Sequence, residues 1–137
     1  MKYQLYSEEN TKELAQNIAK DLQAGDFIFL SGDLGSGKTT FSRYLIQNIA
    51  NDTTIEVVSP TFPIIQYYDN LPQPIIHADF YRLEHEDEIE ELGLDSYLLD
   101  AIFIIEWPEI GQKILPLPKY HLNFKLHNNS RYVTILK

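Results

Sequence analysis

The chain has 137 residues, and its 44% hydrophobic and 23% charged residues are typical of a globular protein rather than a disordered, collagenous or coiled-coil one. This length suits one domain over residues 1–137. The formal net charge of -9, from 20 acidic and 11 basic residues, argues against a protein whose own surface grips nucleic acid, because phosphate binding depends on clustered lysine and arginine.

The residue types and apolar runs favour a cytoplasmic protein with no membrane partner. Cysteine is absent, which excludes disulfides and thiolate metal sites. The amino terminus, MKYQLYSEENTKEL, lacks the basic flank and continuous apolar core of a signal peptide. The longest apolar runs, such as AIFII at 101–105, are far shorter than the ~20 residues that a membrane-spanning helix requires.

The first fifty residues predict a helix, a strand and a second helix. Ser7 suits a helix N-cap, and a stripe of apolar residues at four-residue spacing follows it: Leu14, Ile18 and Leu22. We therefore expect a helix over about 8–23. The short apolar run 27–30 lies between glycines, which is typical of a buried strand. Beyond a glycine-rich loop, helical spacing returns in Phe41, Tyr44, Leu45 and Ile49.

The remainder of the chain predicts further strands. Four short apolar stretches are compatible with strands, namely 57–58, 64–68, 75–78 and 101–105. Prolines or an acidic helical segment separate them. Near the carboxyl end, two alternating runs flank the turn-forming residues 128–130, which predicts a closing β-hairpin. The fold class is therefore α/β.

The glycine-rich loop carries the strongest functional signal. GDLGSGKT at 32–39 fits the pattern G-x-x-x-x-G-K-[ST], with the strand before it and the helix after it that the pattern requires. Glycines let the backbone approach phosphate oxygens, and successive N–H groups at a helix start attract them. Lys38 adds a full positive charge at the phosphates, and the Thr39 hydroxyl can ligate magnesium. The sequence predicts a nucleotide site.

Two carboxylates are candidates to complete this site. Asp79 ends the run PIIHAD and Glu106 ends AIFIIE, so each follows an apolar stretch at the place where nucleotide enzymes position a metal and a water. Either residue could instead cap a helix or end a solvated strand. Which carboxylate ligates metal and which orients water stays open.

Three neighbouring features have two interpretations each. Ser59-Pro60-Thr61 could sense the γ-phosphate or form an ordinary turn. His77, on an apolar run, is more typical of a packed or capping histidine than of a ligand or base. Trp107 suits either core packing or a contact in the site, because it follows Glu106 directly.

The segment EHEDEIEELGLD at 84–95 is strongly acidic and contains neither lysine nor arginine. A solvated helix face explains this composition, and a docking surface for a basic partner is the alternative.

In order, the motifs GDLGSGKTTFSR, SPTF, HADFYRL, EELGLDSYL and IEWPEIG closely resemble those of the TsaE (YjeE) family, small bacterial P-loop ATPases that assist threonylcarbamoyladenosine modification of tRNA. The resemblance covers nearly the whole chain. It implies a single P-loop NTPase domain with a mostly parallel central sheet flanked by helices. It also implies that ATP and magnesium are bound, that the TsaD and TsaB proteins are partners whose complex the ATP cycle resets, and that tRNA is met indirectly through them.

The resemblance also implies roles for individual residues. Gly32 begins the phosphate-binding motif, and the residues that hold the phosphates are Gly35, Ser36, Gly37, Lys38, Thr39 and Thr40. Thr39 and Glu106 correspond to magnesium ligands, and Asp79 to an essential aspartate that also serves the metal. Thr61 falls in the switch-like segment, while Trp107, Glu9 and Arg131 match positions that contact nucleotide. Ser36, Gln66 and Phe80 depart from the usual pattern, and Gln66 removes a charge near the switch.

Two other functions share the phosphate loop. A small P-loop kinase would need cations for a second phosphoryl substrate, and the chain offers only Arg43, Arg82 and Arg131. An ATP-gated binding module would bind nucleotide with little hydrolysis. A GTPase is disfavoured because no N-K-x-D motif occurs.

Overall fold

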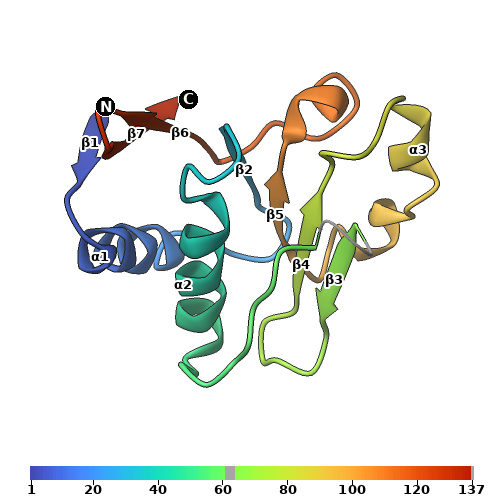
Figure 1. Ribbon diagram of the computed structural model, residues 1–137. Coiled ribbons are helices and arrows are strands. Elements are labelled where there is room, and N and C mark those ends of the chain that lie inside the picture. The colour runs from blue at the N-terminus through green and yellow to red at the C-terminus, as the bar shows by residue number, and fades with distance from the viewer. Residues whose placement is uncertain (61–63, 137) are drawn as a thin grey trace.

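The computed structural model describes residues 1–60 and 64–136 and is built on a seven-stranded mixed sheet (Figure 1). The strands are β1 (Lys2–Leu5), β2 (Phe27–Gly32), β3 (Ile65–Tyr68), β4 (Ile75–Asp79), β5 (Ile102–Glu106), β6 (Tyr120–His127) and β7 (Ser130–Leu136). The helices are α1 (Glu8–Ala19), α2 (Lys38–Ala50) and α3 (Asp87–Glu90), with 3-10 turns η1 (Leu94–Tyr97) and η2 (Pro108–Gly111).

The sheet confirms the expected α/β class and its mostly parallel centre. Its strand order is β1-β7-β6-β2-β5-β4-β3. β2 pairs in parallel with β5 and β6, and β5 pairs in parallel with β4. The outer strands β1, β7 and β3 are antiparallel to their neighbours. The predicted closing hairpin is β6–β7, and its first strand is part of the parallel centre.

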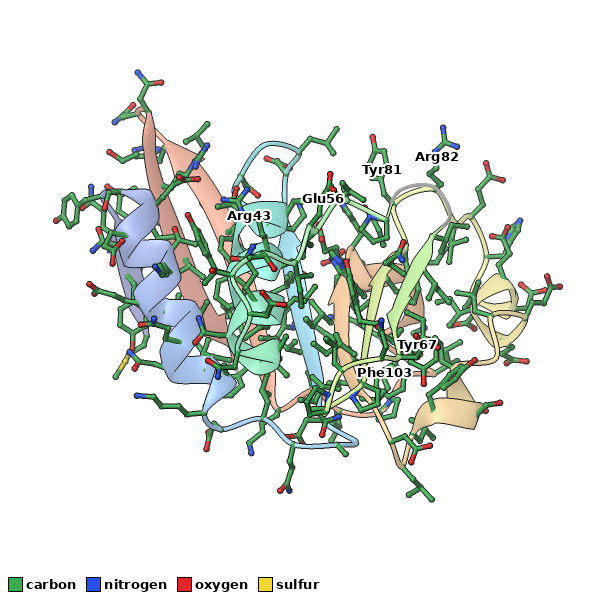
Figure 2. All side chains as sticks on the ribbon, turned by 90° about the horizontal axis from the view of Figure 1, so that it is seen from below. Arg43, Glu56, Tyr67, Tyr81, Arg82 and Phe103 are labelled. Atoms are coloured by element: carbon green, nitrogen blue, oxygen red, sulfur yellow. The ribbon has the colours of Figure 1, made fainter. Side chains whose placement is uncertain are left out.

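Two apolar cores form because successive side chains of a strand face opposite sides of the sheet. From β2, Ile28 and Leu30 belong to the core beneath α1 and α2, which pack against each other. Phe27 and Phe29 belong to the core on the other face. That second core also takes in Ile89 and Leu94, from the segment between β4 and β5. Figure 2 shows side chains filling both layers.

Several sequence-based boundaries need correction. No strand forms at 57–58, because these two residues pair with no other strand. Val57 is buried against the core beneath α1 and α2, whereas Val58 is 57% exposed. The first helix ends at Ala19 instead of about residue 23, since the chain then turns and Asp26 accepts a hydrogen bond from the Gln23 amide. β1 was not expected at all. Its partner is β7, at the opposite end of the chain.

The topology brings the carboxyl ends of β2, β4 and β5 together at one edge of the sheet. β2 leads directly into the glycine loop and α2, while β4 and β5 end at Asp79 and Glu106. Open parallel sheets bind ligands at this edge. Within the described parts of the chain, no helix is both long and apolar enough to cross a bilayer.

Candidate nucleotide-binding site

The glycine loop takes a backbone path that side chains would block. Gly32 has a φ of 133°, and a Cβ atom at this position would lie 2.3 Å from the Phe124 carbonyl oxygen on β6. Gly37 has a φ of 112° and caps α2, whose first residue is Lys38. The loop therefore ends at a helix N-terminus with open amide groups, which is the arrangement that attracts phosphate.

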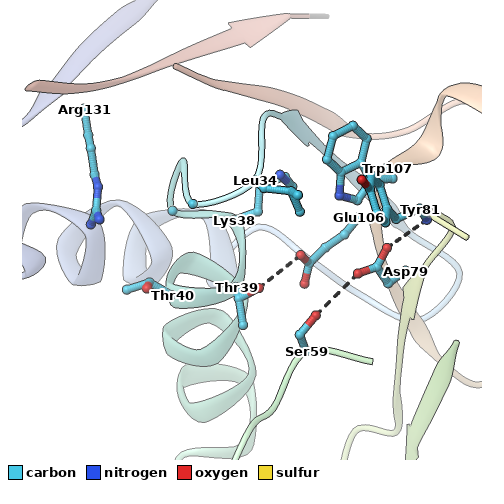
Figure 3. A pocket seen from close by; sticks show the side chains of 12 residues that line it. Leu34, Lys38, Thr39, Thr40, Ser59, Asp79, Tyr81, Glu106, Trp107 and Arg131 are labelled. Atoms are coloured by element: carbon cyan, nitrogen blue, oxygen red, sulfur yellow. Dashed lines mark hydrogen bonds between the residues drawn. The ribbon is translucent and has the colours of Figure 1, made fainter. Parts of the chain in front are cut away.

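A cavity of about 270 Å³ opens beside this loop (Figure 3). Ten residues singled out from the sequence line it: Gly35, Gly37, Lys38, Thr39, Thr40, Ser59, Asp79, Glu106, Trp107 and Arg131. Leu34 and Tyr81 complete the lining. Residues from the loop, from two strand ends and from the hairpin thus meet around one space.

Lys38 is 5% exposed and is held by the loop that precedes it. Its Nζ donates to the carbonyl oxygens of Gly32 at 2.5 Å and Asp33 at 2.9 Å. Burial lowers the pKa of Lys38 from its usual value, and the nearby carboxylates, Glu106 and Asp79 foremost, oppose that shift. The side chain of Lys38 therefore lies in the cavity lining with its nitrogen bound to two neutral carbonyl oxygens.

Glu106 is 1% exposed and faces the start of α2. Its Oε1 accepts from the Thr39 hydroxyl at 3.3 Å, and its Oε2 accepts from Ser42 at 3.2 Å. The same Oε2 lies 2.5 Å from His77 Nε2. The carboxylate is thus bound on both oxygens while one side of it borders the cavity.

Asp79, 3% exposed, faces other groups of the cavity. Its Oδ1 accepts from the Tyr81 amide at 2.9 Å, and its Oδ2 accepts from the Ser59 hydroxyl at 3.4 Å (Figure 3). Two almost fully buried carboxylates consequently border one space with different partners, as distinct roles would require.

Trp107 forms one wall of the cavity in a backbone conformation that is rare for a large side chain, with a φ of 55°. The Lys38 ammonium lies 4.5 Å from the centroid of the Trp107 ring. The centroids of the Tyr81 and Trp107 rings are 4.8 Å apart, and the two ring planes are tilted by 49°. The aromatic pair and the cation thus form one contact group.

Three described sequence candidates, Glu9, Gly32 and Ser36, do not line the cavity. Glu9 is on α1 and does not line the cavity. Gly32 lies at the end of β2, beneath the loop, and Ser36 is buried there with a hydroxyl that has no hydrogen-bond partner among the described residues. Thr61 is outside the described residues. Arg131 does line the cavity, at the opposite end from Asp79 (Figure 3).

The donor set fits magnesium. The Thr39 hydroxyl and the carboxylates of Glu106 and Asp79 are oxygen ligands, which this ion prefers. The described residues contain no group of three or more histidine, cysteine or acidic side chains preassembled around a metal. At phosphate sites, magnesium is usually bound by one or two carboxylates, with waters and phosphate oxygens in the rest of its shell.

Sequence reasoning missed Ser42, Tyr81 and the contact of His77 with Glu106. Ser42 lies three residues after Thr39, so helical spacing placed both hydroxyls on one face of α2. Tyr81 follows Asp79 by two positions, where an aspartate commonly accepts from the backbone. No local pattern signalled that His77 reaches Glu106, because the residues are 29 positions apart.

Comparisons with known proteins give one consistent result. A family model described as "Threonylcarbamoyl adenosine biosynthesis protein TsaE" matches residues 5–133. A relative named "tRNA threonylcarbamoyladenosine biosynthesis protein TsaE" from Rickettsia conorii is 41% identical over 96% of this chain and 75% of its own. The relative of that name from Bacillus subtilis is 36% identical over 91% and 77%. The crystal structure of Bacillus subtilis YdiB is similar with a TM-score of 0.78 and 28% identity, over 98% of this chain and 83% of that chain.

Proposed function

Because the chain belongs to the TsaE family, we propose that it binds ATP with magnesium and hydrolyses ATP to ADP and phosphate in threonylcarbamoyladenosine modification of tRNA. We place its action on the complex of the TsaB and TsaD proteins, which the ATP cycle would reset between turnovers. Contact with tRNA would then be indirect, through that complex.

One observation carries this proposal. A glycine loop that ends at a helix start, a buried lysine and two buried carboxylates face a single cavity. These are the parts that phosphoryl transfer from a nucleotide requires: donors and positive charge for the phosphates, and carboxylates for a metal and a water.

Binding would begin with an exchange of partners at Lys38. The Gly32 and Asp33 carbonyls that hold Nζ are neutral acceptors. Phosphate oxygens are charged and form stronger bonds with an ammonium. The amides at the start of α2 would receive the remaining phosphate oxygens, and Thr40 and Arg131 border the space in which the rest of the nucleotide would lie.

Thr39 and Glu106 are the residues we assign to magnesium, because the hydroxyl and Oε1 already lie 3.3 Å apart. When bound, the ion would neutralise charge that develops on the phosphate oxygens. Asp79 is left to orient and deprotonate the attacking water. Its partners, the Ser59 hydroxyl and the Tyr81 amide, would fix the carboxylate for that task.

We expect hydrolysis by the isolated protein to be slow. Arg131 is the single arginine in the described lining of the cavity, and it lies at the end opposite to the carboxylates. Arg43 instead pairs with Glu8 at 3.4 Å on the surface. Arginine that stabilises charge in the transition state is commonly supplied by a partner, so the TsaB–TsaD complex is the expected source of stimulation.

A cell-based experiment tests this function. In a bacterium depleted of its own TsaE, the threonylcarbamoyladenosine content of tRNA is measured by mass spectrometry after expression of this chain or of Lys38→Ala. The proposal predicts that the wild-type chain restores the modification and the variant does not. Equal restoration by both chains would contradict a role for the phosphate loop, and equal failure of both, with both expressed and folded, would contradict the assignment to this pathway.

A further inference from the structure

The buried contact between His77 and Glu106 has no part in the function proposed above. His77 is fully buried on β4, and its Nε2 lies 2.5 Å from Glu106 Oε2. An ionised carboxylate can only accept hydrogen bonds, so Nε2 carries the proton and donates. The pair joins strand β4 to the carboxylate that we assign to magnesium.

We propose that His77 is a positioning residue that holds Glu106 Oε2, so that Oε1 is presented to Thr39 and the cavity. The proposal rests on the proposed function, since it concerns the geometry of the magnesium site. The two oxygens of Glu106 would thereby have separate tasks. Oε2 would anchor the side chain, and Oε1 would be offered to the ion.

Among the contacts of Glu106, the one from His77 is the shortest. Ser42 also approaches Oε2, at 3.2 Å, but its single hydroxyl proton is nearer to the Lys38 carbonyl oxygen, at 2.9 Å. Thr39 reaches Oε1 at 3.3 Å, which is long for a hydroxyl donor. A carboxylate that is 1% exposed needs a strong donor to compensate for lost water, and His77 supplies it.

The position of His77 makes it a rigid anchor. Ser42 and Thr39 belong to α2, which follows the phosphate loop directly, whereas His77 is within the sheet, opposite Gln66 of β3 and Ile104 of β5. Partners behind the metal ligands set ligand orientation, and their loss commonly lowers metal affinity about 10- to 100-fold.

The second ring nitrogen argues against a purely structural role. Nδ1 of His77 is buried and has no hydrogen-bond partner among the described residues. A histidine that serves mainly to connect the core would use both nitrogens, because an unmade buried hydrogen bond costs free energy. The bond to Glu106 therefore accounts for the presence of histidine at this position.

The test uses two amide variants that differ in reach. Glutamine can place its amide nitrogen near the position of Nε2, whereas asparagine places it near Nδ1 and cannot reach Glu106. The dissociation constant of ADP is measured by calorimetry in excess EDTA and in excess magnesium. The readout is the constant in EDTA divided by the constant in magnesium. Ile76→Val, a mild change in the buried part of the same strand but on its other face, controls for loss of stability.

We expect His77→Asn to lower the ratio about tenfold, or to one where the wild-type ratio is below ten, with ADP affinity in EDTA unchanged. His77→Gln and Ile76→Val should keep the wild-type ratio. A folded His77→Asn with the wild-type ratio would overturn the proposal. So would an equal loss of affinity in EDTA and magnesium, or an equal fall of the ratio in both amide variants.

The wild-type chain provides a second measurement, which does not depend on how the variants fold. In nitrogen NMR spectra of protein with labelled histidine, the proton of His77 is expected on Nε2. A proton on Nδ1 with Nε2 bare would overturn the proposal. Failure of the proposed function looks different, because wild-type protein would then bind no ADP under either condition.

Discussion

Asp79 and Glu106 occupy paired positions on the neighbouring parallel strands β4 and β5. Residues in register on adjacent strands point to the same face of a sheet, so both carboxylates reach one cavity although 27 positions separate them in sequence. Their partners differ: Glu106 contacts hydroxyls of α2, whereas Asp79 contacts Ser59 and the Tyr81 amide. This division underlies the separate roles proposed for them.

Removal of Lys38 should strongly weaken nucleotide binding. Lys38→Ala deletes the buried cation that we assign to the phosphates, and loss of a buried charged partner costs about 2–5 kcal/mol, or roughly 30-fold or more in affinity. Calorimetric titration with ATP measures the loss. Lys20→Ala, at an exposed position directly after α1 and outside the cavity lining, is the matched control and should bind ATP normally. Wild-type affinity in Lys38→Ala would rule out the phosphate loop as the nucleotide site.

Neutral carboxylate variants should separate hydrolysis from binding. Glu106→Gln should reduce ATP hydrolysis about 10- to 100-fold through loss of the magnesium ligand. Asp79→Asn should reduce it about 100-fold or more through loss of the base. Both variants should still bind ATP, since neither carboxylate holds the phosphates directly.

The same variants test the binding-module alternative. If ATP only gates docking, Glu106→Gln should support full tRNA modification while Lys38→Ala supports none. If hydrolysis is required, both should fail. Quantification of the modified nucleoside in cells distinguishes the two results.

Gly32 should be irreplaceable for folding as well as for binding. An alanine there would place Cβ 2.3 Å from the Phe124 carbonyl oxygen at a φ of 133°, and the clash and backbone strain should together cost about 3 kcal/mol or more. Gly93→Ala is the control, because its φ of 70° strains alanine by about 1 kcal/mol but its Cβ meets no atom within 4 Å. Urea unfolding measures both, and equal losses would contradict the steric account.

The glycine loop and the two carboxylates could be predicted from the sequence because their signals are local. A phosphate loop is a contiguous pattern, and Asp79 and Glu106 each end an apolar run. β1 could not be predicted, since its four residues, Lys2–Leu5, form a strand only by pairing with β7. The contact of His77 with Glu106 could not be predicted either, because it joins two strands that are far apart in sequence. The strand predicted at 57–58 was wrong because two apolar residues form a strand only where another strand pairs with them, and none does here.

His121 should make stability depend on pH. Burial lowers its pKa, and Glu109 opposes the shift only in part. His121 therefore binds a proton more readily in the unfolded chain than in the folded chain. The contribution of neutral His121 to the free energy of unfolding is complete above its unfolded pKa of about 6.5 and is lost as pH falls through the lower folded pKa.

Urea unfolding at pH 7.5 and pH 5.5 measures this effect. Wild-type protein should lose more stability between the two values than His121→Gln, which keeps a polar group near Ser31 but cannot titrate. Identical pH dependence in the two proteins would show that His121 does not contribute.

We propose that this chain hydrolyses ATP in its phosphate-loop cavity and that the TsaB–TsaD complex stimulates the reaction. The decisive experiment measures phosphate release from ATP by the purified protein, alone and with TsaB and TsaD, with Lys38→Ala as the blank. We predict a slow Lys38-dependent rate that the two partners raise. A rate equal to that of Lys38→Ala under both conditions, for protein that is folded, would contradict the claim.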